Sequence, residues 1–234
     1  MAVPEAVAGL AAIPGVRTAA QLGEPTADTS TSAGSLPVAS ALAGLLPGGL
    51  RRGSAVSVGG STALVLALLA EATCEGSWAA ITGMPEVGVV AAAELGVDLD
   101  RLALVPNPGA ELVAVVSALI DGFDLVVLGP AVVRGVQPQL ARRLAGRLRN
   151  RGAVLVAAGP WPGADLELRV SKRRWRGLTD DGFGHLESCD VVATSRGRGA
   201  AVRPRSVELR LPGPGGAVAA VEASAGRALA EVAG

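Results

Sequence analysis

A glycine-rich turn between an apolar strand and an apolar helix is the strongest candidate for a chemical site in this sequence. Gly59-Gly60-Ser61-Thr62 follows the apolar run 55–58 and opens the helical stretch 62–75. Backbone N–H groups at such a turn bind phosphate, and a hydroxyl at the start of the helix can hold Mg²⁺. The turn is therefore a candidate nucleotide-binding site made of Gly59, Gly60, Ser61 and Thr62.

The turn lacks the parts that phosphoryl transfer requires. A working phosphate loop reads G-x-x-x-x-G-K-[ST], and this loop is about three residues shorter and has no lysine. A second requirement is an aspartate that ends an apolar strand and holds Mg²⁺, but Gly129 follows the strand 124–128. We therefore expect no catalytic residue, no cofactor and no ATP hydrolysis. A simple tight turn and residual nucleotide binding through the helix N-terminus both stay open.

Few other side chains are able to do chemistry. His185 is the only histidine, and Cys74 and Cys189 lie 115 positions apart. No spacing among these residues is typical of a metal site or a catalytic triad. We expect two free thiols and no bound metal.

Positive charge is concentrated in the second half of the chain. Residues 1–133 hold 4 arginines and 12 acidic residues, whereas residues 134–210 hold 16 basic and 7 acidic residues. This asymmetry favours an anionic partner, nucleic acid or an acidic protein, and a solvated arginine-rich surface is the alternative. The candidate contact residues lie on the helix 136–150 and in a basic run with one aromatic residue: Arg142, Arg149, Arg173, Arg174, Trp175 and Arg176.

Aromatic residues are too few to form a platform that stacks several bases. The chain has two Phe, three Trp and no Tyr. DNA contact is then limited to phosphates, and we expect weak, non-specific binding with a Kd of roughly 10⁻⁴ to 10⁻⁶ M.

The elements that must position these residues alternate regularly in the middle of the chain. Short apolar runs predict strands at 55–58, 78–82, 102–105, 124–128 and 153–157, with helices at 62–75, 86–95, 110–121 and 136–150 between them. Apolar strands separated by helices are typical of a parallel sheet covered on both faces. Beyond Gly159 the stretches 165–175, 186–194 and 201–211 alternate like antiparallel strands, with a hairpin turn at 195–199.

Composition divides the chain into four parts. We expect an N-terminal extension and linker at 1–35, an α/β core at 36–160, a β-rich part of the same domain at 161–211, and an Ala/Gly/Pro-rich tail at 212–234 that carries little of the core. The longest apolar run, 63–70, is far too short to span a bilayer, and the N-terminus lacks a basic signal-peptide region. These features predict a cytoplasmic protein with no membrane partner.

Two motifs resemble the core of the RecA-like ATPase superfamily. Residues 42–53 (LAGLLPGGLRRG) precede the first core strand, and residues 95–102 (LGVDLDRL) lead into a later one; the resemblance covers 36–160. It implies an α/β fold with a RecA-like, mostly parallel sheet flanked by helices and antiparallel strands added at the C-terminal end. It also places Met84 where the superfamily has its catalytic glutamate, with Glu86 two positions away.

The C-terminal part looks most like the actinobacterial ImuA-prime type of the degenerate ImuA/SulA-like branch. The motifs are Arg174-Trp175-Arg176-Gly177-Leu178, Gly184-His185-Leu186, Gly197-Arg198 and Arg203-Pro204-Arg205. This resemblance implies a non-catalytic accessory protein of SOS mutagenesis, which works in error-prone translesion DNA synthesis and associates with the nucleoid when DNA is damaged. The implied partners are an ImuB-like Y-family polymerase homologue and an error-prone C-family polymerase. The alternatives are a SulA-like inhibitor of cell division and a nucleotide-binding RecA-like ATPase.

Overall fold

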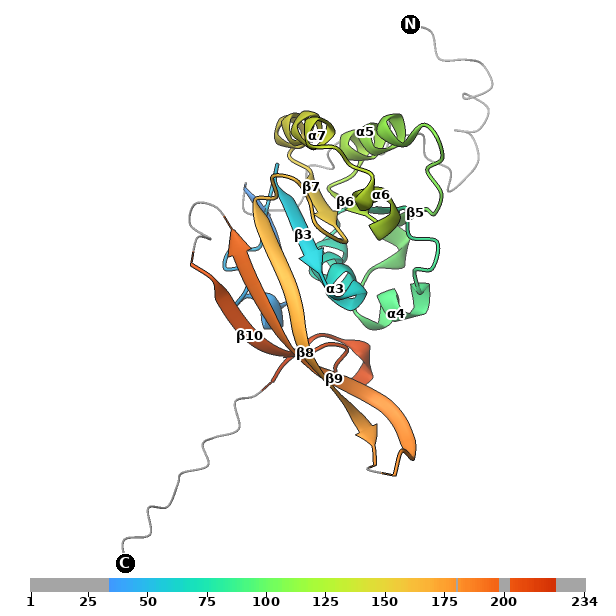
Figure 1. Cartoon of the computed structure of the whole chain (residues 1–234), viewed down its shortest axis with the longest axis vertical. Helices are drawn as coiled ribbons and strands as arrows, with labels where there is room; N and C mark the ends of the chain where they lie inside the picture. The colour runs from blue at the N-terminus through green and yellow to red at the C-terminus, as the bar shows by residue number, and fades with distance from the viewer. Residues whose placement is uncertain (1–33, 180, 198–202, 222–234) are drawn as a thin grey trace, which may run out of the picture.

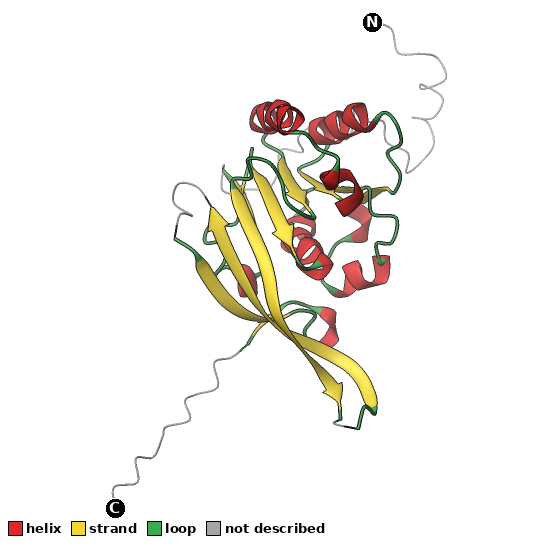
Figure 2. Ribbon diagram, viewed as in Figure 1, coloured by secondary structure: helices red, strands yellow, loops and turns green. Residues whose placement is uncertain are grey.

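The computed structural model describes residues 34–179, 181–197 and 203–221. These residues form a nine-stranded sheet with helices on both faces, in the strand order β11-β10-β9-β8-β3-β7-β6-β4-β5 (Figures 1 and 2). A separate two-stranded ribbon pairs β1 (Ser35–Leu36) with β2 (Leu50–Arg51). The arrangement is the expected mostly parallel sheet with antiparallel strands at its C-terminal end.

Five short strands form the parallel part, and the apolar runs predicted all of them. They are β3 (Ala55–Gly59), β4 (Ala79–Thr82), β5 (Leu102–Val105), β6 (Leu125–Leu128) and β7 (Val154–Ala157). The strands β4, β6 and β7 are buried along their whole length because helices cover both of their faces. Their parallel pairing brings the carboxyl ends of β3 and β6 to the same edge of the sheet.

The helices form two layers. One face packs against α3 (Thr62–Cys74), α4 (Val89–Glu94) and the segment 36–50, which contains η1 (Ser40–Leu42). The other face packs against α5 (Leu112–Gly122), α6 (Pro130–Arg134) and α7 (Pro138–Arg151). A 3-10 turn, η2 (Leu99–Arg101), leads into β5. No helix in the described part of the chain has the length and apolar character needed to cross a membrane.

Two helix predictions differ from the structure. The helix expected from residue 86 begins at Val89, because Met84 and Val87 form a turn and Gly88 takes the N-cap position. The five-residue helix α6 was not predicted, since one turn and a half is too short to give a helical period. Pro130 occupies its first turn, where the missing N–H costs no hydrogen bond.

The C-terminal half adds long strands. β8 (Leu166–Leu178) runs parallel to β3 and antiparallel to β9 (Gly184–Gly197), and β10 (Arg205–Arg210) pairs with β9. The hairpin turn expected at 195–199 is wrong for Ser195–Gly197, because these residues continue β9 in its pairing with β8. Residues 198 and 199 lie outside the described part.

One face of this half has no helix from the described residues over it. Leu168, Val170, Val191 and Ala193 point into the cluster that contains α3. The alternate side chains of β8 and β9 are mostly polar and point to the opposite face, which α5–α7 cover only over the parallel strands. We call this surface of β8, β9 and β10 the open face.

The first ten residues of the expected tail pack on the domain. Ala219 and Ala220 form β11 beside β10, and η4 (Pro214–Gly216) brings Gly216 against Glu94 of α4. The Cys189 amide donates to the Pro212 carbonyl at 2.9 Å, and Leu211 is buried. Backbone pairing thus attaches residues 212–221 to the domain, while among their hydrophobic side chains only Val218, partly buried, packs against the core.

Truncation after Leu211 is expected to lower the melting temperature by about 4–8 °C. It removes the Pro212 acceptor of the Cys189 amide and the Val221 amide that donates to Glu208, and two backbone hydrogen bonds contribute about 2 kcal/mol. The matched control is truncation after Val221, which keeps every contact described here. Equal melting temperatures for the two truncated chains would show that residues 212–221 stabilise nothing.

Candidate functional site

The glycine turn at the end of β3 is shaped by close backbone packing. Gly60 has φ of +86°, and a Cβ atom there would lie 2.7 Å from the Val170 carbonyl oxygen of β8. Ser61 is the N-cap of α3, and its hydroxyl accepts a hydrogen bond from the Leu64 amide at 3.1 Å. One of the amides that would bind a phosphate therefore already has a partner. Thr62 is exposed at the first position of the helix.

The carboxyl end of β6 is closed by a backbone contact. A Cβ atom at Gly129 would overlap the Gly83 carbonyl oxygen and lie 2.5 Å from Cγ of Met84. The Gly129 amide also donates to the Thr82 carbonyl at 2.8 Å, which locks the two strand ends together. Met84 is buried in this contact. The positions where the resemblance would place a Mg²⁺-binding aspartate and a catalytic glutamate are thus in direct contact, with no room for a longer residue at 129.

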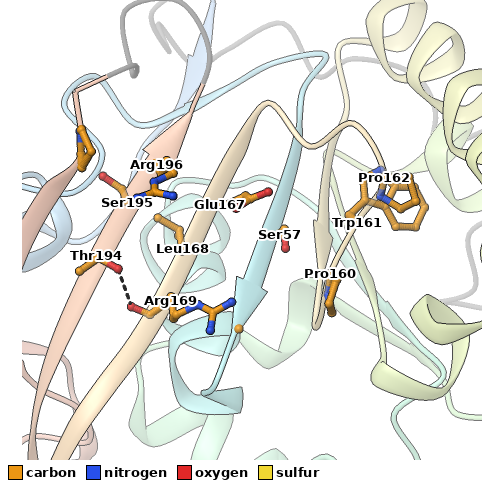
Figure 3. Close-up of a pocket in the computed structure, with 12 residues that line it drawn as sticks. Ser57, Pro160, Trp161, Pro162, Glu167, Leu168, Arg169, Thr194, Ser195 and Arg196 are labelled. Carbon is orange, nitrogen blue, oxygen red and sulfur yellow. Dashed lines mark hydrogen bonds between the residues drawn. The ribbon is translucent and has the colours of Figure 1, made fainter.

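A groove of about 680 Å³ adjoins the glycine turn on the open face (Figure 3). Strands β3, β8 and β9 form its floor, and Pro160-Trp161-Pro162 forms one side. Ser57 donates to the Gly159 carbonyl at 2.8 Å and so ties β3 to this side of the groove. Gly59 also lines the groove, so the groove extends to the carboxyl end of β3.

The groove carries opposite charges at its floor. Arg169 and Arg196 line it and form no ion pair within the described residues, while Glu167 lies opposite Arg196 in the β8–β9 register. Such a set of donors and acceptors suits a polar chain or ligand. This site was not predicted, because only the pairing of β8 with β9 brings Arg169 and Arg196 to one groove. The alternation of residues 165–175 was the available signal for one half of it.

The basic run lies on the part of β8 that extends beyond the sheet. Lys172 has φ of +49° at an irregularity in the β8–β9 register, and Arg173, Arg174, Trp175 and Arg176 are all exposed. Trp175 lies opposite the buried Cys189, whereas Arg174 lies opposite Asp190 on the other face. The run thus presents cations on both faces of the hairpin.

Asp190 holds two arginines at the base of this hairpin. Its carboxylate accepts from Arg176 Nε at 2.6 Å and from Arg210 Nε at 3.0 Å. The hydrogen bond from Arg176 has the largest effect on the pKa of Asp190 and lowers it; burial opposes this, and the weaker bond from Arg210 lowers the pKa again, so that the pKa is lowered overall. Arg176 therefore serves the fold, which leaves Arg173 and Arg174 available to a partner.

The arginines of α7 lie at the other end of the molecule. Arg142 and Arg149 are exposed, and Arg142 Nε donates to the Pro138 carbonyl at 3.3 Å. Arg147 and Arg151 both bind Asp121 of α5. Figure 1 shows α7 and the far end of the β8–β9 hairpin at opposite ends of the domain. The structure does not bring the two groups of candidate contact residues together.

The fold and site define an α/β protein whose parallel sheet ends in a tightly packed glycine turn. Residues 44–163 match the family model described as the MT3502 N-terminal domain, and the chain belongs to this family. It is also similar to the uncharacterized protein Rv3395c of Mycobacterium tuberculosis (strain ATCC 25618 / H37Rv). The two are 37% identical over 164 residues, which cover 66% of this chain and 80% of that protein. A mycobacterial relative is consistent with the expected actinobacterial ImuA-prime-like family.

The contact at Gly129 predicts that no side chain is tolerated there. Gly129→Ala is expected to destabilise the protein by about 3 kcal/mol or more, because its Cβ overlaps the Gly83 carbonyl. Gly146→Ala is the matched control, since a Cβ there meets no atom within 4 Å and alanine favours the helix by about 1 kcal/mol. Urea unfolding measures both. An unfolding midpoint for Gly129→Ala at or above that of the wild type would contradict the closed edge.

The Asp190 cluster predicts a pH-dependent contribution to stability. A carboxylate whose pKa is lowered by folding stabilises the native state above its ordinary pKa of 3.8, and this contribution disappears as the pH falls through the lowered value. Asp190→Asn should therefore be less stable than the wild type at pH 7, with the difference shrinking below about pH 4. Thermal unfolding at a series of pH values tests this. A difference that stays constant down to pH 2 would exclude the charged contacts as its cause.

Proposed function

We propose that this protein is a non-catalytic accessory protein with a RecA-like core, acting through protein contacts in an error-prone translesion DNA synthesis complex. The observation that carries the proposal is the contact of Gly129 with Gly83 and Met84. In an ATPase, this place holds Mg²⁺ and a general base. Because packing fills it here, we expect the surfaces of the domain to carry its function.

The strand order supports the RecA-like core. The strand that ends in the glycine turn, β3, and the strand that ends in Gly129, β6, are separated only by β7. Ligands of open parallel sheets bind outside the carboxyl ends of the strands, so these two ends are where a nucleotide would lie in an active relative. Here packing closes the same edge. We therefore favour a domain that descends from a nucleotide-binding protein over one that binds nucleotide itself.

The partners in this proposal are an ImuB-like Y-family polymerase homologue and an error-prone C-family polymerase. The motifs Arg174-Trp175-Arg176-Gly177-Leu178 and Gly184-His185-Leu186 that suggest them lie on the exposed β8–β9 hairpin, where a partner has access. DNA contact adds weak, salt-sensitive affinity through free arginines, because counterion release carries no sequence information. Association with the nucleoid would follow from the complex.

Two alternatives make different demands. A SulA-like inhibitor of cell division would bind the division-ring protein and would not need the free cations at Arg173 and Arg174. A nucleotide-using ATPase would show Mg²⁺-dependent turnover that Thr62→Ala abolishes. The proposed accessory protein is expected to show neither property.

Charge reversal on the two separated arginine groups tests the proposed function. We expect the wild-type chain to co-purify with the ImuB-like partner, and Arg173→Glu/Arg174→Glu to weaken this binding because no acidic residue of the described chain neutralises these two side chains. Arg142→Glu/Arg149→Glu is the matched pair on α7, at the opposite end of the domain. Failure of the wild type to bind the ImuB-like partner, together with capture of the division-ring protein, would replace the proposal with the SulA-like alternative.

A further inference from the structure

The outer part of the β8–β9 hairpin stands apart from the rest of the domain. Register pairing of β8 with β3 ends at Arg169, and pairing of β9 with β10 ends at Asp190. The described residues 172–179 and 181–188, which we call the outer hairpin, pair only within the β8–β9 ribbon, where Arg174 and Trp175 still face Asp190 and Cys189 at its base. Figure 1 shows them extending past every helix of the domain. An isolated two-stranded ribbon is marginally stable in water, so a partner surface is the natural support for this extension.

The outer hairpin exposes large apolar side chains at its far end. Leu178 is 50% exposed, Phe183 75% and Leu186 52%, and Trp175 is 49% exposed closer to the sheet. Leu178 pairs with Gly184, which Phe183 directly precedes and Leu186 follows by two positions, so the three side chains come from the same end of the hairpin. The whole chain has five aromatic residues, and two of them are exposed on this hairpin. Aromatic side chains held in the open are typical of binding anchors.

Positive charge surrounds the shaft of the outer hairpin. Lys172, Arg173 and Arg174 form no ion pair within the described residues, while Arg176 is held by Asp190. The acidic side chains are engaged locally, since Asp181 accepts from the Thr179 hydroxyl and Glu187 lies 3.8 Å from His185. The hairpin thus has an apolar end and a cationic shaft. This combination complements an apolar pocket with carboxylates at its rim.

We propose that the outer hairpin is the docking element of this protein, with Leu178, Phe183 and Leu186 inserted into an apolar pocket of the polymerase-like partner and Arg173 and Arg174 meeting carboxylates at the rim of that pocket. The inference rests on the proposed function. It assigns the binding affinity to the apolar end, and the association rate and the salt dependence of binding to the cationic shaft.

Other occupants fit this surface less well. A second copy of the chain would place one cationic shaft against another, which opposes self-association. DNA offers no pocket to Leu178 or Phe183, and the carboxylate of Asp181 at the same end repels phosphate. The outer hairpin also lies outside residues 44–163, the segment that the family model matches. This position is expected for a recognition element added to a shared core.

The test measures binding of the full-length chain to the purified ImuB-like partner at two salt concentrations. We expect Phe183→Ser/Leu186→Ser to weaken binding about 10- to 100-fold at both. Arg173→Glu/Arg174→Glu should weaken it more at low salt than at high salt. Val90→Ser, on α4, is the matched control, because Val90 is 73% exposed and lies outside the hairpin. All variants should keep the wild-type melting temperature, since these side chains contribute nothing to the buried core.

The outcomes separate this inference from the proposed function. Wild-type binding that survives Phe183→Ser/Leu186→Ser would overturn the docking element and leave the accessory function in place. A wild-type chain that does not bind the ImuB-like partner would overturn both. Sedimentation of the chain alone, and its titration with single-stranded DNA, complete the test. Loss of a dimer or of DNA binding in the Phe183→Ser/Leu186→Ser variant, with partner binding intact, would assign the apolar end to that other occupant.

Discussion

The close approach of Gly129 to Gly83 and Met84 is the constraint on which the parallel half of the domain depends. It joins the carboxyl ends of β4 and β6, and it sets the point from which α6 departs at Pro130. Val132 of α6 then packs over Gly83, where a Cβ atom would overlap its side chain. A loop that must bind a phosphate needs open backbone at this edge. The same edge is here filled by the Gly83 peptide and the Met84 side chain.

The parallel core was predictable from the sequence because each of its signals is local. Continuous apolar runs mark β6 and β7, and glycines such as Gly96 and Gly152, both at positive φ, end the helices before the next strand. The absence of an aspartate at 129 was also visible in the sequence. That a side chain there would collide with Gly83 was not, since the collision depends on two strands that lie 46 residues apart in the chain.

The surface features were harder to predict because they depend on pairing across distance. The excess of basic residues in 134–210 was visible in the sequence, but it did not reveal that Arg147 and Arg151 share Asp121 or that Arg176 and Arg210 share Asp190. Four of the 16 basic residues of this segment are thereby used to attach one element to another. The open face was hard to predict for a similar reason. Alternating polar and apolar residues distinguish the two faces of a strand, but they do not show which face the helices cover.

The separation of the outer hairpin from the sheet has a consequence for how this protein changes over evolutionary time. A residue of β6 is surrounded on both sides, so most replacements there disturb the packing of the whole core. The described residues of the outer hairpin are exposed apart from Gly177 and Ser188, so replacements there disturb the core far less, except at Gly177 and Gly184, where a Cβ atom would overlap the backbone of the facing strand. Specificity can then diverge between related organisms while the scaffold stays constant, and a hairpin exchanged between two such proteins would carry the partner preference with it.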